Sequence, residues 1–118
     1  MLVAVLGLGV AQSPAIAETY DTAVIGLVRA SYKHMRLAYS CRDFGSSTYL
    51  DARIATEIAL RATGLPTILA VAVTAEIASE IRFDEGFAAV SLADCTVGLS
   101  RTRKAVATWR ERVLRIQR

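Results

Sequence analysis

The stretch that decides the fold is Leu92–Ile116, which reads LADCTVGLSRTRKAVATWRERVLRI. Its apolar and small side chains recur in steps of three and four residues, at Leu92, Cys95, Leu99, Thr102, Val106, Trp109, Val113 and Ile116. Such spacing places these side chains along one side of an α-helix and is typical of a seam between packed helices. The pattern therefore predicts a long helix over Phe87–Ile116, with Cys95 and Trp109 facing the core.

Helical periods also run through the chain before this stretch, and no run of alternating β-branched residues indicates a strand. They predict helices from Thr19 or Tyr20 to Cys41, over Thr48–Thr63 and over Pro66–Ile81. In the second of these, we expect Leu50, Ile54 and Ile58 to face the core. The third is apolar all round from Ile68 to Val73, which is typical of a buried helix at the centre of a bundle. The fold class predicted is all-α, a four-helix bundle-like single domain.

Several residues indicate where these helices begin, end or approach a neighbour. Ser47 is expected to cap the second helix, because a serine side chain can accept from an unpaired backbone N–H there. Gly64 occupies a position suited to a left-handed helix cap, and Pro66 suits the first turn of the next helix. Gly98 lies inside the last helix and indicates close approach of a neighbouring element. A break of that helix near Ser100 is left open.

The first seventeen residues, MLVAVLGLGVAQSPAIA, have the character of an export signal. The apolar run ends in Ala15-Ile16-Ala17, the small-x-small pattern that a signal peptidase cuts. The apolar stretch of about ten residues is too short to span a membrane, which needs roughly 20. We therefore expect a signal peptide over residues 1–17, cleavage near Ala17, and a periplasmic or secreted domain over residues 18–118. The run lacks the usual leading Lys or Arg, which leaves open a start upstream of Met1.

Export bears on the two cysteines of the chain, Cys41 and Cys95, because thiol pairs close into disulfides in oxidising compartments. Periodicity places Cys95 on the core side, facing the end of the first helix where Cys41 lies. A Cys41–Cys95 bond would close a loop of about 55 residues and stabilise the fold by roughly 4 kcal/mol in the chain-entropy model. The alternative is a pair of buried free thiols.

The residues suited to catalysis do not form a recognisable constellation. His34 is the single histidine of the chain, and it lies on the apolar side of the first helix, where we expect a partly buried, hydrogen-bonded imidazole. Glu76 and Glu80 share a helix face and are expected to be solvated carboxylates. A zinc site needs four N or S ligands, or three and a water, and one histidine with two committed cysteines does not supply them. We therefore expect no enzyme activity, no catalytic residues, no metal and no cofactor.

Positive charge gathers at residues 101–118, where seven cations face one acid, Glu111. The cations are Arg101, Arg103, Lys104, Arg110, Arg112, Arg115 and Arg118. In an exported chain whose one tryptophan, Trp109, lies on the apolar seam, this pattern does not predict a nucleic-acid partner. It is typical of a solvated helix face, or of attraction to an acidic protein partner or an anionic envelope surface.

Two resemblances follow from the residues around the cysteines. The segment SYKHMRLAYSC over residues 31–41, with the second cysteine 54 positions later, resembles the small periplasmic immunity proteins that neutralise type VI secretion amidase effectors. The run Cys41-Arg42-Asp43-Phe44, with Cys95-Thr96 and Trp109, is similar to the single-disulfide periplasmic chaperones of acid stress. This chain departs from those chaperones in its longer first helix and its Arg-rich last helix.

These resemblances imply a non-enzymatic, exported protein-binding domain, in the first place an immunity-type inhibitor that occludes a secreted cell-wall amidase or other toxin. The alternatives are an acid-stress chaperone and an envelope assembly adaptor or pilotin-like factor, and a homodimer is left open. The partner-binding residues expected are Phe83, Asp84, Glu85 and Phe87, because aromatic side chains beside flexible charged residues are common interface anchors. Both phenylalanines could instead pack inward around the turn.

Overall fold

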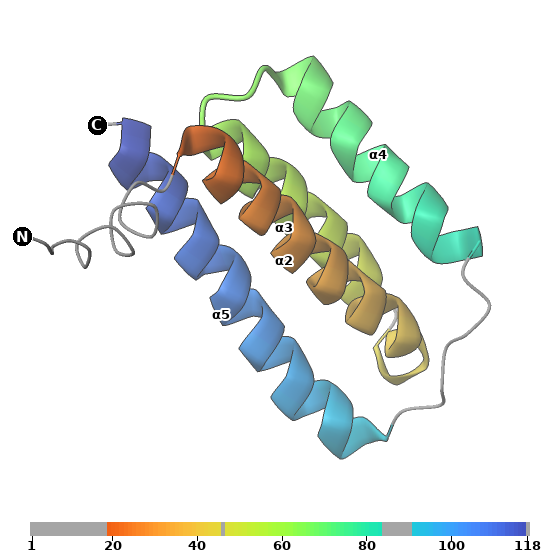
Figure 1. Cartoon of the computed structure of the whole chain (residues 1–118). Coiled ribbons are helices and arrows are strands. Elements are labelled where there is room, and N and C mark those ends of the chain that lie inside the picture. The colour runs from red at the N-terminus through yellow and green to blue at the C-terminus, as the bar shows by residue number, and fades with distance from the viewer. Residues whose placement is uncertain (1–18, 46, 84–90, 118) are drawn as a thin grey trace, which may run out of the picture.

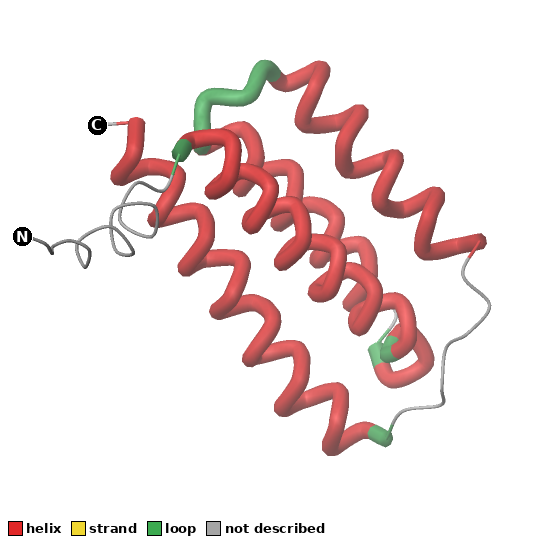
Figure 2. Tube along the Cα trace, in the orientation of Figure 1, coloured by secondary structure: helices red, strands yellow, loops and turns green. Residues whose placement is uncertain are grey.

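The computed structural model describes residues 19–45, 47–83 and 91–117. These ranges contain four α-helices, α2 (Tyr20–Ser40), α3 (Thr48–Ala62), α4 (Thr67–Phe83) and α5 (Leu92–Gln117), and one short 3-10 helix, η1 (Arg42–Phe44). No strand occurs within them, and a short loop connects α3 to α4 (Figure 2). The prediction of an all-α, four-helix bundle-like domain is confirmed.

Helix α2 is the element around which the others pack. It lies against α5 along most of its length and also contacts α3 and α4. Helices α4 and α5 occupy opposite sides of the α2–α3 pair, so the bundle is broad (Figure 1). The helix at the centre is therefore α2, which has a distinct apolar side, whereas α4 forms one edge.

The core consists of two clusters, one at each end of the bundle. The first contains Leu27, Ala30, Ala59, Leu60, Ala70 and Val106, and the second contains Met35, Ala38, Ala52, Ile77, Ala78 and Ile81. Val28 and Val73 pack against both clusters and connect them. Half of the clustered side chains are alanines, which allow the helix backbones to approach closely and still pack densely.

The prediction for the buried face of α3 was wrong. Leu50, Ile54 and Ile58 are 57%, 48% and 47% exposed, and the helix buries the opposite face, with Ala52, Thr56, Ala59 and Leu60. Small residues on that face let α3 lie close to α2. The buried hydroxyl of Thr56 donates to the carbonyl of Ala52 (2.9 Å), so its burial leaves no unpaired polar group.

The expectation that the third helix lies at the centre of the bundle was also wrong. Ile68 of α4 is 79% exposed, and Leu69 and Val71 are also exposed. The side that α4 buries carries Ala70, Thr74, Ile77, Ala78 and Ile81. A helix that is apolar all round has little preference for one face, so its position depends on which neighbours it meets.

The helix ends follow the local sequence in most places. Gly64 has a φ of 93°, the left-handed conformation that glycine adopts without strain, and it ends α3 as predicted. Pro66 lies just before α4, and its carbonyl accepts from the N–H groups of Leu69 and Ala70. The expected cap at Ser47 was wrong, because its backbone is in the right-handed helical region and its side chain makes no capping hydrogen bond.

A disulfide between Cys41 and Cys95 joins the end of α2 to the first turn of α5, as predicted. The seam of α5 is also largely confirmed, since Cys95, Val106 and Val113 are buried and Trp109 is half-buried. Leu92, the first residue of α5, departs from this seam and is 59% exposed. Helix α5 continues through Ser100 without a break.

Candidate functional site

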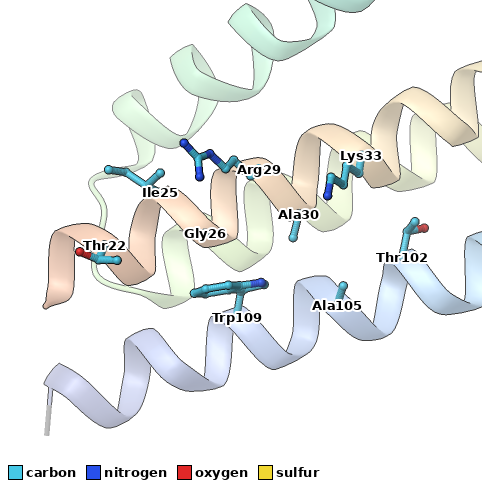
Figure 3. Close-up of a pocket in the computed structure, with 9 residues that line it drawn as sticks. All are labelled: Thr22, Ile25, Gly26, Arg29, Ala30, Lys33, Thr102, Ala105 and Trp109. Atoms are coloured by element: carbon cyan, nitrogen blue, oxygen red, sulfur yellow. The ribbon is translucent and has the colours of Figure 1, made fainter. Parts of the chain in front are cut away.

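A groove of about 460 Å³ lies between α2 and α5. Helix α2 contributes Thr22, Ile25, Gly26, Arg29, Ala30 and Lys33, and α5 contributes Thr102, Ala105 and Trp109. The residues of α2 recur at steps of one, three and four, so one face of the helix forms a whole wall. Figure 3 shows this wall above Trp109, Ala105 and Thr102 of α5.

The tryptophan of the groove lies against a glycine of the facing helix. A Cβ atom at Gly26 would overlap Cζ3, Cε3 and Cη2 of the Trp109 ring, so glycine is what admits the ring at this point. Figure 3 shows the flat ring lying beneath α2 at Gly26. The guanidinium of Arg112 stacks on the same indole, with its Cζ 4.4 Å from the ring centroid. Trp109 is thus both a packing residue and part of the groove surface.

Positive charge borders the groove. Arg29 and Lys33 are both exposed and lie four residues apart on α2, on the groove-facing side. Among the described residues that line the groove, none is a carboxylate. The groove therefore combines an aromatic surface with a cationic border, a pairing suited to a ligand with an apolar part and negative charge.

Both ends of the groove are fixed by hydrogen bonds. At one end, the carbonyl of Thr63 accepts from Oη of Tyr20 (3.3 Å) and from Nε2 of Gln117, which ties α2 and α5 to the end of α3. Further along, Nδ1 of His34 lies 2.7 Å from Oγ1 of Thr102. These contacts hold the two walls of the groove at a set separation.

His34 is 4% exposed, which confirms the buried, hydrogen-bonded histidine expected from the sequence. The hydroxyl of Thr102 also donates to the carbonyl of Leu99 (3.3 Å), which favours the tautomer of His34 with its proton on Nδ1. Burial, and then the nearby charge of Arg103, lower the pKa of His34 below its ordinary value. The imidazole is therefore neutral at pH 7 and has a structural role.

A second cavity, of about 350 Å³, lies on the other side of His34. It is lined by His34, Thr48, Asp51, Ala52, Ala55, Leu99 and Arg103. Within residues 19–45, 47–83 and 91–117, no three His, Cys, Asp or Glu side chains come together as metal ligands. The same part of the chain has no helix long and apolar enough to cross a membrane.

The partner-binding residues expected from the sequence lie at the edge of what the structure describes. Phe83 is the last residue of α4, and the structure does not describe its side chain. Asp84, Glu85 and Phe87 are outside the described residues altogether. Their role in binding stays a prediction.

The groove was missed by sequence reasoning, although one signal could have indicated it. Gly26 lies in the middle of a helix, where glycine is unfavourable relative to alanine by about 1 kcal/mol. A glycine at such a position indicates that something large approaches the helix. The sequence does not say that this is Trp109, since that requires knowing that α2 and α5 pair.

Comparison of this chain with protein-family models, with curated proteins and with solved structures found no match.

Proposed function

We propose that this chain is an exported, non-enzymatic domain that binds another protein, and that it acts as an immunity-type inhibitor by occluding a partner enzyme. The observation that carries the proposal is the groove between α2 and α5, with Trp109 as its aromatic surface. Tryptophan and arginine are the residue types most enriched among the energetically dominant residues of protein interfaces. Here Trp109 and Arg29 both line the groove, and Arg112 stacks on the Trp109 ring.

Three further features support this proposal. The Cys41–Cys95 disulfide is the kind of covalent link that persists in oxidising compartments. The groove is held by the α2–α5 pairing and by hydrogen bonds at both ends, so it is preorganised for binding. The buried His34 is hydrogen-bonded to Thr102, which accounts for it as a packing residue between α2 and α5.

The second candidate is a chaperone of acid stress, and a specific observation favours it. Large apolar side chains are exposed on the outer faces of α3 and α4, with Leu50, Ile54 and Ile58 following one another at four-residue steps. Exposed apolar faces of this kind are interaction surfaces. A chaperone would use them for many unfolded clients, whereas an inhibitor needs its native fold and one partner.

The experiment compares the two functions in one protein preparation. The proposal expects a secreted amidase or other toxin to be encoded beside the gene of this chain. That enzyme is titrated at neutral pH with the oxidised domain over residues 18–118, and its activity is measured. The proposal expects a 1:1 complex and loss of activity. A protein that leaves the enzyme active, and that suppresses aggregation of unfolded clients at pH 2 to 3, would be a chaperone instead.

A further inference from the structure

We propose that the groove between α2 and α5 receives an acidic segment of the partner protein, with one apolar side chain placed on Trp109 and carboxylates facing Arg29 and Lys33. This inference rests on the proposed function in one respect, namely that the ligand is a segment of a protein. It adds the chemistry of that segment and the position of each part of it in the groove.

The apolar part of the site is the hollow next to the indole. Ala30 and Ala105 line it with side chains of one carbon, so the space between the two helices stays open beside Trp109. A volume of about 460 Å³ lies within the range of small-ligand sites, about 300 to 1,000 Å³, and is larger than one side chain needs. A single aromatic or branched aliphatic side chain with its backbone fits this space and covers the exposed part of the ring.

The charged part of the site is the α2 border. Arg29 and Lys33 have no ion pair with any carboxylate in the described ranges of the chain, so both charges remain available to a ligand. Arg112, stacked on Trp109, adds positive charge on the α5 side. The sequence over residues 101–118 is net positive by six, which extends the field beyond the groove. A field of this sign raises the rate at which an acidic partner associates and favours its orientation.

The single tryptophan makes the site directly observable. Trp109 is the one tryptophan of the chain, so fluorescence excited at its absorption edge reports on the groove alone. The probe is the synthetic peptide acetyl-Glu-Asp-Phe-Glu-Asp-amide, which carries one apolar anchor between carboxylates. Its matched control, acetyl-Gln-Asn-Phe-Gln-Asn-amide, has the same shape and no charge.

We expect the acidic peptide to change the Trp109 emission saturably and the neutral peptide to bind at least fivefold more weakly. Arg29→Gln and Lys33→Gln should each weaken the acidic peptide about two- to fivefold, the size usual for an exposed charge pair. Raising the salt concentration from 50 to 500 mM should weaken it further. Lys104→Gln removes the same charge from a position of α5 that does not line the groove, and it should weaken the acidic peptide less than either Arg29→Gln or Lys33→Gln.

Three other results would overturn the inference, and each would point to a different explanation. Equal binding of the two peptides would refute the claim that the segment is acidic. It would leave the proposal that the groove binds a protein segment. No change of Trp109 emission with either peptide, together with a change on adding anionic phosphatidylglycerol vesicles, would assign the groove to a lipid surface. If neither peptides nor vesicles affect Trp109, while the 1:1 enzyme complex still forms, the partner binds elsewhere and only this inference fails.

Discussion

The contact between Gly26 and Trp109 determines how closely α2 and α5 pack. Gly26→Ala places a methyl group where the indole ring now lies, and an indole cannot move aside as a flexible chain end can. We expect the free energy of unfolding to fall by about 1 to 3 kcal/mol, as overpacking usually costs. The measurement is the midpoint of urea unfolding, with unfolding monitored by circular dichroism.

Gly98→Ala is the matched control for this substitution. The atom that a Cβ would meet there is Cδ2 of Leu37, at 2.7 Å, the far end of a side chain that can change rotamer. Alanine also has a helix propensity higher by about 1 kcal/mol, so the net effect should lie within about 1 kcal/mol of zero. If Gly26→Ala is as mild as Gly98→Ala, the packing described for Trp109 is wrong.

Burial of His34 makes the stability depend on pH. Its folded pKa lies below the ordinary value of about 6.5, so below that pH the unfolded chain takes up a proton that the folded protein does not. With respect to this group, the free energy of unfolding is therefore highest above about pH 7, and it decreases as the pH falls toward the folded pKa of His34. The charged groups around the ring are Arg103 of α5, which opposes protonation, and Asp51 of α3, across the same cavity.

The test compares wild type with His34→Gln, which cannot titrate, by urea unfolding at pH 7.5 and pH 5. Wild type should lose more stability than the variant between these two values. A wild type whose pH dependence matches that of the variant would show that His34 is not held neutral by the fold.

Helices α3 and α4 show that burial in this fold follows small residues as much as large apolar ones. Ile68 and Ile81 are the same residue type on the same helix, but Ile68 is 79% exposed and Ile81 is fully buried. Ile81→Ala should lower the free energy of unfolding by about 2 to 4 kcal/mol. Ile68→Ala should change it by about 0.5 kcal/mol or less, as surface substitutions do. Equal losses would place α4 at the centre of the bundle after all.

The sequence predicts the helices and the seam of α5 because both follow from period and from local signals. Cys95, Val106 and Val113 repeat at helical steps, and Gly64 takes the conformation that its position required. The orientation of α3 and the edge position of α4 do not follow, because both helices carry apolar residues on more than one face. Which face is buried depends on the close fit of residues such as Ala52 and Ala59 against other helices.

The same distinction applies to the candidate site. The cations of α2 and the tryptophan of α5 are visible in the sequence, but they lie far apart along the chain. Only the pairing of α2 with α5 places Arg29 and Lys33 around the same groove as Trp109. The role expected for Phe83 and Phe87 remains a prediction, because the structure does not describe their side chains.

For the molecule as a whole, the disulfide is a covalent contribution to stability that reduction removes without substituting any residue. It links residues 54 positions apart, and closing a loop of that length stabilises a fold by about 4 kcal/mol in the chain-entropy model. Reduction should lower the urea midpoint accordingly, and the Cys41→Ser, Cys95→Ser double variant should match the reduced protein. Equal midpoints before and after reduction would contradict this role.

An exported domain joined by one disulfide is the central claim, and the intact mass of the protein recovered from the cell envelope tests it most directly. The mass should correspond to residues 18–118 with two hydrogens lost to the Cys41–Cys95 bond, and it should not change on alkylation without prior reduction. A species that retains Met1, or one that takes up two alkyl groups without reduction, would contradict the claim.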